Sequence, residues 1–399
     1  MDSILIFGGG ELQLSLIKTV KNMGFSTIVI DPDVNAPGKD ISDLFFVVDA
    51  ENFQSTLDIA KHYKVKGVVT TATDHPVIMM AKIASKLNLR FPSLESVSTI
   101  LDKATFKNVL QNNNIPCAKG YSYYIFERPI ELDLNYPIII KPNRNSGSRG
   151  VFKCYSYEEL LNFLPDTIKF CSDGKYLIEE YIEGDEISVE GYIYQGKLQI
   201  VQVTDKIVSK PPYNVEMGHI QPSKYRDSIE DIYYLLNRVV SATGLDNCGI
   251  HPELKVNDSG FHLIEMGPRL GGDYITSHLV PLSTGFNIEE AIIKISIGEE
   301  PNYEFEDNAA MIKYLDIPDH TIVQKCPTEN FVKAISDNVK EFSFKLKCGD
   351  VVPHITNSLD RYGYIIISCN TISEMINEVD EINQQISRLI MGNVGKIKQ

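Results

Sequence analysis

The sequence predicts a mixed chain, α/β in its first part and α+β in its second, with domains over residues 1–95, 96–300 and 301–399. Strands and helices alternate in the first part, which is typical of a parallel sheet. Apolar strands joined by polar turns dominate the second part, and short strands with one terminal helix make up the third. The length of 399 residues favours two or three domains of about 100–200 residues each.

The first domain opens with an apolar strand at residues 3–7, a turn of three glycines at 8–10 and a helical pattern over 11–23. A strand at 26–30 completes a strand-helix-strand unit. The alternation continues in strands at 45–48 and 67–71 and helices at 53–63 and 75–87. We therefore expect a ligand crevice beyond the carboxyl ends of the strands, lined by loops 8–12, 31–38 and 71–75. The glycine turn lacks the full G-x-G-x-x-G fingerprint, so NAD binding is not predicted, and a simple turn into a helix is the alternative.

The second domain begins with a helix expected over residues 96–112, which include Lys103. A strand over 136–141 ends in Lys141, and a run of small and polar residues from 143 to 150 follows. A strand end fixes an ammonium group, and a flexible run offers backbone N–H groups to phosphates. The Walker A pattern is missing. The order predicts phosphate binding, with a solvated helix lysine and a solvent loop as the alternatives.

Further strands are expected over residues 176–182, 186–194 and 198–204, and a helix over 229–243. The stretch from 205 to 223 is polar and contains prolines, and no strand is assigned to it. It carries Glu216 and His219. A lone histidine in such a stretch is more often structural or exposed than functional.

Residues 250–272 give the strongest sign of a metal-nucleotide site. We expect two short strands on a three-residue loop at 258–260, whose last residue is a left-handed glycine. This loop sets Glu253 opposite Glu265, and like charges opposed on a sheet repel by roughly 0.2–1 kcal/mol. The pair therefore invites a cation, and Mg²⁺ suits two carboxylates because it takes its other ligands from water and phosphates. Arg269 can reach the same phosphates, whereas the alternative is a surface hairpin with two solvated glutamates.

Beyond residue 301 the chain changes to short strands at 311–315, 341–347 and 364–368. A final helix over about 373–389 has its apolar residues on one stripe. We expect this part to be a small β-rich piece packed by that helix, with a structural role.

Composition restricts the classes of function. Hydrophobic residues make up 43% of the chain and charged residues 23%, which is typical of packed soluble domains. No apolar run approaches the roughly 18 residues of a membrane span, and no signal-peptide pattern opens the chain. The net charge of -15 disfavours nucleic-acid binding. Seven scattered cysteines without a C-x-x-C pair argue against a disulfide framework and a structural zinc, so we expect a cytoplasmic protein without membrane or nucleic-acid partners.

The order of these motifs resembles the ATP-grasp carboxylate-amine ligases over nearly the whole chain. The shared features are the glycine turn, the lysine-bearing helix, the strand ending in IIIKP, the E-E-Y-I-x-G-x-E signature and the late E…E-x-x-P-R hairpin. The resemblance implies an N-terminal pre-ATP-grasp domain, a central ATP-grasp domain with ATP between two subdomains, and a flap near residues 145–150. It implies ATP and Mg²⁺ as cofactors, with Mn²⁺ as a substitute, and a homodimer as a common arrangement.

The resemblance also assigns roles to individual residues. Contacts to ATP are implied for Lys103, Lys141, Ser146, Gly147, Ser148, Gly150, Glu179, Glu180, Tyr181, Ile182 and Glu186. Metal binding is implied for Glu253 and Glu265, and catalysis for Arg269, Lys141 and His219. Substrate contacts are implied for Gly10, Glu11, Leu12, Asp74, Glu216, Arg269, Gly271 and Gly272.

One position departs from the family pattern. Many members have asparagine two residues after the second metal glutamate, and this chain has Gly267. A third side-chain ligand is therefore missing. We expect water to replace it in a weaker or more open second metal position.

Two closer resemblances leave the substrate open. The GGGEL turn and the DVNAP segment look like purine-pathway ligases that act on a phosphoribosyl amine, such as phosphoribosylamine-glycine ligase. The TDK motif and the segment with Glu216 and His219 look more like L-amino acid ligases and carbamoyl-phosphate-synthase-like proteins. We expect a ligase that joins a small carboxylate, an amino acid, to an amine through an acyl phosphate and releases ADP and phosphate. The alternatives are a purine-pathway ligase and a non-catalytic ATP-binding regulatory protein.

Overall fold

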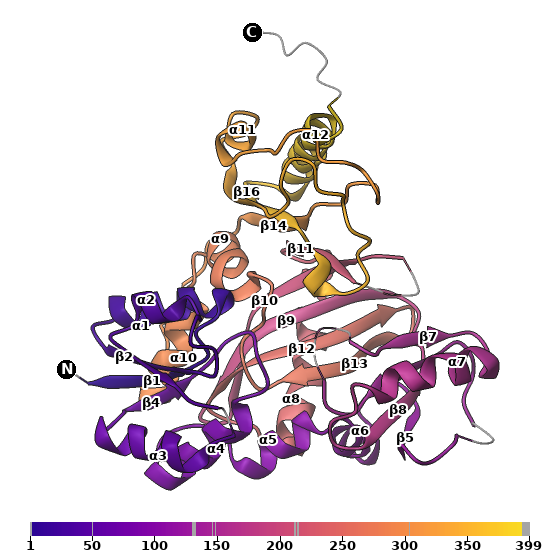
Figure 1. Ribbon diagram of the computed structural model, residues 1–399. Helices are drawn as coiled ribbons and strands as arrows, with labels where there is room; N and C mark the ends of the chain where they lie inside the picture. Colours follow the sequence, from indigo (N-terminus) through magenta and orange to yellow (C-terminus); the bar gives the residue numbers. More distant parts are fainter. Residues whose placement is uncertain are drawn as a thin grey trace.

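The computed structural model describes residues 2–49, 51–129, 133–145, 147, 149–210, 213, 215–302 and 304–392. Three sheets organise them, one of eight strands and two of four. In Figure 1 the N-terminal sheet and a small antiparallel sheet flank the large sheet, and the C-terminal strands form its upper end. Among the helices of these residues, none has the length and apolar character needed to cross a bilayer.

The N-terminal sheet is parallel, as the alternation of strands and helices predicts. Its strands are β1 (Ser3–Phe7), β2 (Ser26–Asp31), β3 (Leu44–Val47) and β4 (Gly67–Val69), in the order β3-β2-β1-β4. Its helices are α1 (Leu14–Asn22), α2 (Gly38–Ile41), α3 (Phe53–His62) and α4 (Val77–Leu87), with a 3-10 turn at Glu11–Gln13. Gly8 ends the fully buried β1 with a φ of +95°, a conformation that favours glycine. The loops after the strands meet at one edge of the sheet.

The single helix expected over residues 96–112 is in fact two helices, α5 (Leu94–Leu101) and α6 (Lys103–Asn112). Asp102 separates them in an extended conformation, and its carboxylate accepts a hydrogen bond from the Thr105 amide at 2.9 Å. An aspartate in this position caps and begins a new helix. The break makes Lys103 the first residue of α6.

The small antiparallel sheet contains the predicted IIIKP strand. Its strands are β5 (Gly120–Tyr124), β6 (Ile138–Pro142), β7 (Phe152–Cys154) and β8 (Lys175–Glu180), in the order β5-β8-β6-β7. Helix α7 (Tyr157–Ile168) packs on β6, β7 and β8. The predicted flap joins β6 to β7, and Ser146 and Ser148 in it lie outside the described residues. Gly147 and Gly150 both have positive φ values, +69° and +74°.

The large antiparallel sheet runs in the order β13-β12-β9-β10-β11-β14-β16-β15. Its strands are β9 (Asp185–Tyr194), β10 (Lys197–Val208), β11 (Glu216–Gln221), β12 (Cys248–Asn257), β13 (Gly260–Gly267), β14 (Ala309–Tyr314), β15 (Val339–Phe344) and β16 (Gly363–Cys369). The polar stretch from 205 to 223, to which no strand was assigned, therefore holds the end of β10 and all of β11. The strand pattern is hidden because charged residues such as Lys206, which pairs with His219, face inward.

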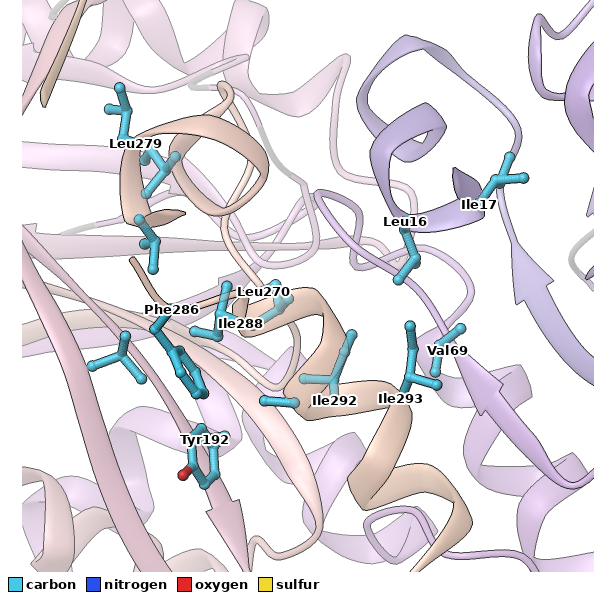
Figure 2. Packing of buried hydrophobic residues seen from close by; sticks show 14 of the residues in the cluster. Leu16, Ile17, Val69, Tyr192, Leu270, Leu279, Phe286, Ile288, Ile292 and Ile293 are labelled. Carbon is cyan, nitrogen blue, oxygen red and sulfur yellow. The ribbon is translucent and has the colours of Figure 1, made fainter. Parts of the chain in front are cut away.

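The remaining helices are α8 (Ile229–Thr243), α9 (Val280–Thr284), α10 (Ile288–Ile297), α11 (Glu329–Lys333) and α12 (Ile372–Ile390), with short helical turns at Arg226–Ser228, Ile275–Leu279 and Ser358–Asp360. A hydrophobic cluster around α10 joins the N-terminal sheet to the large sheet. Figure 2 shows Leu16 and Val69 beside Ile293 of α10, while Tyr192 faces Phe286. This packing fixes the loops of the parallel sheet against the large sheet.

One buried carboxyl group interrupts this apolar packing. Glu289 of α10 is 1% exposed and accepts hydrogen bonds from Ser15 Oγ at 2.7 Å and Thr19 Oγ1 at 3.3 Å. Its Oε1 has no partner among the described residues. Burial raises the pKa of Glu289 to about 7, because the charged form loses its hydration.

The folded chain should therefore keep a proton on Glu289 that the unfolded chain loses near pH 4.5. Stability contributed by this group falls as the pH rises from 4.5 to about 7. Glu289→Gln cannot ionise, so we expect it to stabilise the chain by up to about 3 kcal/mol at pH 8 and little at pH 4.5. Urea unfolding at both pH values measures the difference. The control Glu290→Gln, which removes an ion pair with Lys294, should lower the free energy of unfolding by less than about 0.5 kcal/mol. An equal effect of Glu289→Gln at both pH values would contradict the raised pKa of Glu289.

Candidate active site

The predicted hairpin sets two glutamates opposite each other. Glu253 of β12 pairs directly with Glu265 of β13, which confirms the predicted register. The loop was predicted wrongly, because Asn257 pairs with Gly260 and only two residues lie between them. A bulge at Ile264 then shifts the register by one residue and restores the glutamate pair.

A buried lysine compensates the charge of the first glutamate. The side chain of Lys206 is 1% exposed, and its Nζ lies 2.7 Å from Glu216, 2.9 Å from Glu253 and 3.4 Å from Glu186. Burial opposes the ammonium charge, but the three carboxylates outweigh it and raise the pKa of Lys206 well above its ordinary value. The ammonium group of Lys206 therefore occupies the position among three carboxylates where a metal ion could otherwise bind.

A buried histidine, His251, lies between Glu253 and a second carboxylate, Glu190. His251 Nδ1 lies 3.0 Å from Glu190 Oε2, and His251 Nε2 lies 3.6 Å from Glu253 Oε1. Burial disfavours the charged ring, but Glu190 outweighs it and raises the pKa of His251 to about 9. A Cβ at Gly271 would lie 2.7 Å from His251 Nδ1 and 2.9 Å from Glu190 Oε2. Glycine at 271 thus leaves room for this pair, and its predicted substrate contact stays a prediction.

The predicted phosphate lysines are also held by carboxylates. Lys103 Nζ lies 3.0 Å from Glu265 Oε1. Lys141 and Lys107 lie 2.7 Å and 2.9 Å from the two oxygens of Glu179. Burial opposes the charge of Glu179, but the two lysines outweigh it and lower the pKa of Glu179 below its ordinary value. The side chain of Glu179 therefore orients Lys141.

Arg269 connects the hairpin to the N-terminal domain. Its Nε and Nη2 donate to the two oxygens of Asp74 at 2.8 Å and 2.9 Å. A bidentate pair fixes the plane of a guanidinium group. A Cβ at Gly267 would lie 3.0 Å from Arg269 Cζ. The glycine that departs from the family pattern therefore leaves space for this arginine.

The C-terminal part, expected to be structural, contributes an arginine to the site. Arg361 donates to both oxygens of Asp273 at 2.6 Å and 2.7 Å and lies 3.8 Å above the ring of Tyr314. His219 Nε2 lies 3.4 Å from Asp273 Oδ2. Burial opposes the charge of Asp273, but His219 and Arg361 outweigh it and hold the pKa of Asp273 far below its ordinary value.

Many of these groups line one cavity of about 480 Å³. The predicted residues that line it are Leu12, Lys103, Lys141, Gly147, Glu179, Glu180, Tyr181, Ile182, Glu186, Glu216, Glu253, Glu265, Arg269 and Gly272. The predicted residues that do not line it are Gly10, Glu11, Asp74, Gly150, His219 and Gly271. His219 is fully buried, and the catalytic role that the resemblance implies for it stays a prediction.

Charged residues that were not predicted complete the site: Lys107, Lys206, His251, Lys255, Asp273 and Arg361. His251 and Lys255 lie two residues before and after Glu253, so the two-residue period of a strand could have identified them. Lys206 belongs to the TDK motif, to which no site role was given, and Arg361 gave no local signal because its partner Asp273 is 88 residues away.

The donor set suits a divalent cation with phosphates. Glu253 and Glu265 offer hard oxygen ligands, which Mg²⁺ prefers. Each of them already has an ammonium group within 3.0 Å, from Lys206 and Lys103 respectively. The hairpin therefore accommodates positive charge at both glutamates.

Two family models match separate parts of the chain. The ribonucleotide synthetase preATP-grasp domain matches residues 1–100, and the ATP-grasp domain matches residues 134–277. The C-terminal section of the carbamoyl phosphate synthase large chain of Methanocaldococcus jannaschii is 22% identical over 324 residues. That match covers 74% of this chain and 51% of the relative, so the chain spans about half the length of that relative.

Solved structures share the fold at low sequence identity. The L-amino acid ligase from Bacillus licheniformis has a TM-score of 0.82 and 19% identity, covering 96% of this chain and 97% of that chain. The phosphoribosylglycinamide synthetase from Anaerococcus prevotii has a TM-score of 0.75 and 22% identity, covering 100% of both chains.

Replacing the buried lysine should expose the repulsion that it prevents. Lys206→Met leaves Glu186, Glu216 and Glu253 without their shared ammonium partner, and we expect a loss of about 3–5 kcal/mol in unfolding free energy. Added Mg²⁺ without nucleotide should recover part of that loss. Urea unfolding with and without MgCl₂ measures both effects.

The matched control is Lys224→Met, because Lys224 is exposed and pairs with Asp185 at 2.7 Å. It should change stability by no more than about 1 kcal/mol, with no response to Mg²⁺. Similar losses in the two variants would contradict the role given to Lys206.

Proposed function

We propose that this chain, in which the ribonucleotide synthetase preATP-grasp domain matches residues 1–100 and the ATP-grasp domain matches residues 134–277, is a carboxylate-amine ligase that joins an amino acid, as the carboxylate, to an amine at the expense of ATP. The observation that carries this proposal is the cavity that Lys103, Lys141 and Arg269 line together with the opposed pair Glu253 and Glu265. Cations for phosphates and carboxylates for a metal thus face one space.

The chemistry requires activation of the carboxylate. A carboxylate does not react with an amine at neutral pH, because an oxide ion would have to leave. Transfer of the γ-phosphoryl group to the carboxylate gives an acyl phosphate, from which the amine displaces phosphate. Catalysis of the first step consists mainly of positioning and of neutralising charge.

The residues divide this work according to their positions. Lys103 and Lys141 bind phosphate oxygens after exchanging their carboxylate partners Glu265 and Glu179. Arg269, oriented by Asp74, stabilises the acyl phosphate with a planar set of donors. Glu186, at the start of β9, receives the ribose hydroxyls of ATP.

Glu253 and Glu265 would hold Mg²⁺, which supplies charge neutralisation to the phosphates when bound. Mn²⁺ is a candidate substitute. Gly267 offers no side-chain ligand, so water would take that position beside a bound metal. Lys206 stays beside Glu253 and limits the negative charge around the metal.

Two observations favour an amino acid over a phosphoribosyl substrate. The Gly9 amide in the glycine turn already donates to a carboxylate, Asp31 Oδ2, at 2.7 Å, which disfavours a phosphate in the same place. Glu216, Asp273 and Arg361 line the same cavity and offer both signs of charge to an amino acid. Glu216 is the proposed anchor for a substrate ammonium group.

The test is release of ADP and phosphate from ATP and Mg²⁺ in the presence of amino acids, singly and in pairs, and of glycinamide-ribonucleotide-type amines with small acids. We expect release only with a particular amino acid and amine, with one ADP formed for each new amide bond. Release that requires a phosphoribosyl amine would support the purine-pathway alternative instead. Tight ATP binding without release from any mixture would contradict the ligase and support the non-catalytic alternative.

A variant that tests the mechanism in the same assay is Arg269→Ala. Loss of a donor that acts on the developing charge should lower turnover by about 100-fold, while ATP affinity changes little. Equal losses of turnover and affinity would contradict the role of Arg269. The homodimer, the cytoplasmic location and the division into three domains stay predictions.

A further inference from the structure

The C-terminal part contains three thiols that the proposed ligase reaction does not use, and two of them lie side by side. Cys326 and Cys348 are 22 residues apart in the sequence, and their Sγ atoms lie 3.2 Å apart. Both are free thiols, and neither lines the active cavity. We propose that Cys326 and Cys348 form a thiol-modification site, where exchange with a low-molecular-weight disulfide produces a reversible disulfide between them.

Backbone hydrogen bonds, and not the thiols, bring the two segments together. The Val323 amide donates to the Asp350 carbonyl at 2.9 Å, and the Gly349 amide donates to the Val323 carbonyl at 2.8 Å. The Val352 amide donates to the Thr321 carbonyl at 2.9 Å. These bonds form a short antiparallel ladder beside the cysteines. The thiols therefore meet because the chain holds them, so a disulfide requires only a small movement of the side chains.

The two thiols differ in exposure. Cys348 is exposed, and Cys326 is partly buried. Partial burial raises the pKa of the Cys326 thiol, and its hydrogen bond with Cys348 raises that pKa further. Cys348 is therefore the thiol that reacts first with an external disulfide, and Cys326 is the one that resolves the product.

The exchange balances in two steps. The Cys348 thiolate attacks one sulfur of the external disulfide, a mixed disulfide forms, and the other external sulfur leaves as a thiolate that takes a proton. The Cys326 thiolate then attacks the Cys348 sulfur, the internal disulfide forms, and the second external thiol leaves. The protein thiols lose two electrons, and the external disulfide gains two.

The site lies at the start of a segment that reaches the active cavity. Residues 349–361 follow Cys348 directly and end at Arg361, which binds Asp273. Ser358 and Leu359 of the same segment also line the cavity. A disulfide between Cys326 and Cys348 would anchor the origin of this segment to residue 326.

The test uses the full reduced chain, oxidised glutathione as the probe, and alkylation of the remaining thiols. Trypsin cleaves after Lys325, Lys333, Lys347 and Arg361, so the two cysteines begin the separate peptides 326–333 and 348–361. We expect a non-reducing digest to contain these two peptides joined, with two of the seven thiols lost and no glutathione retained. Dithiothreitol should separate the peptides again.

Two variants make the result specific. Cys326→Ser should stop at a glutathione adduct on Cys348, because the resolving thiol is missing. Cys171→Ser, in which a hydroxyl can replace a thiol that contacts the Thr167 carbonyl, should give the joined peptides as the natural chain does. A natural chain that keeps glutathione on Cys348 would overturn the proposal, as would oxidation of other cysteines before this pair.

Discussion

Pairing of buried charges is the constraint on which the site depends. Glu186, Glu216 and Glu253 come from neighbouring strands of one sheet, and the ammonium group of Lys206 lies among them. Without that cation three partly buried carboxylates would lie together at the cavity wall, where removing one partner of a buried ion pair costs several kcal/mol. The same holds for Glu265 beside Lys103. The site is therefore a set of ion pairs around one cavity, and on the proposed function a metal with phosphates would bind by exchanging partners within these pairs.

Two arginines join the parts of the chain around this network. Arg269 of the hairpin binds Asp74 of the N-terminal domain, and Arg361 of the C-terminal part binds Asp273. The hydrophobic contacts of α10 hold the N-terminal sheet against the large sheet. The groups that line the cavity therefore depend for their positions on three separate parts of the chain. We expect a small movement between those parts to alter binding and catalysis together.

Sequence patterns predict the elements whose apolar periodicity is regular and fail where charge is buried. The parallel sheet and the opposition of Glu253 to Glu265 were predictable. The opposition was predicted with the wrong loop length, and the bulge at Ile264 cancels that one-residue error in register. The strand β11 was missed because its inward face is polar, and the break at Asp102 was missed because a cap interrupts an otherwise helical pattern. Arg361 was unpredictable, because its partner is 88 residues away in the sequence. The two cysteines likewise meet only through backbone pairing of remote segments.

The most direct test of the account is the position of Mn²⁺ in crystals of the complex with ADP, located by anomalous scattering. The account predicts Mn²⁺ between the carboxylates of Glu253 and Glu265, with the ammonium group of Lys103 moved from Glu265 to a phosphate oxygen. Mn²⁺ bound elsewhere, with the pair of Lys103 and Glu265 intact at 3.0 Å, would contradict it.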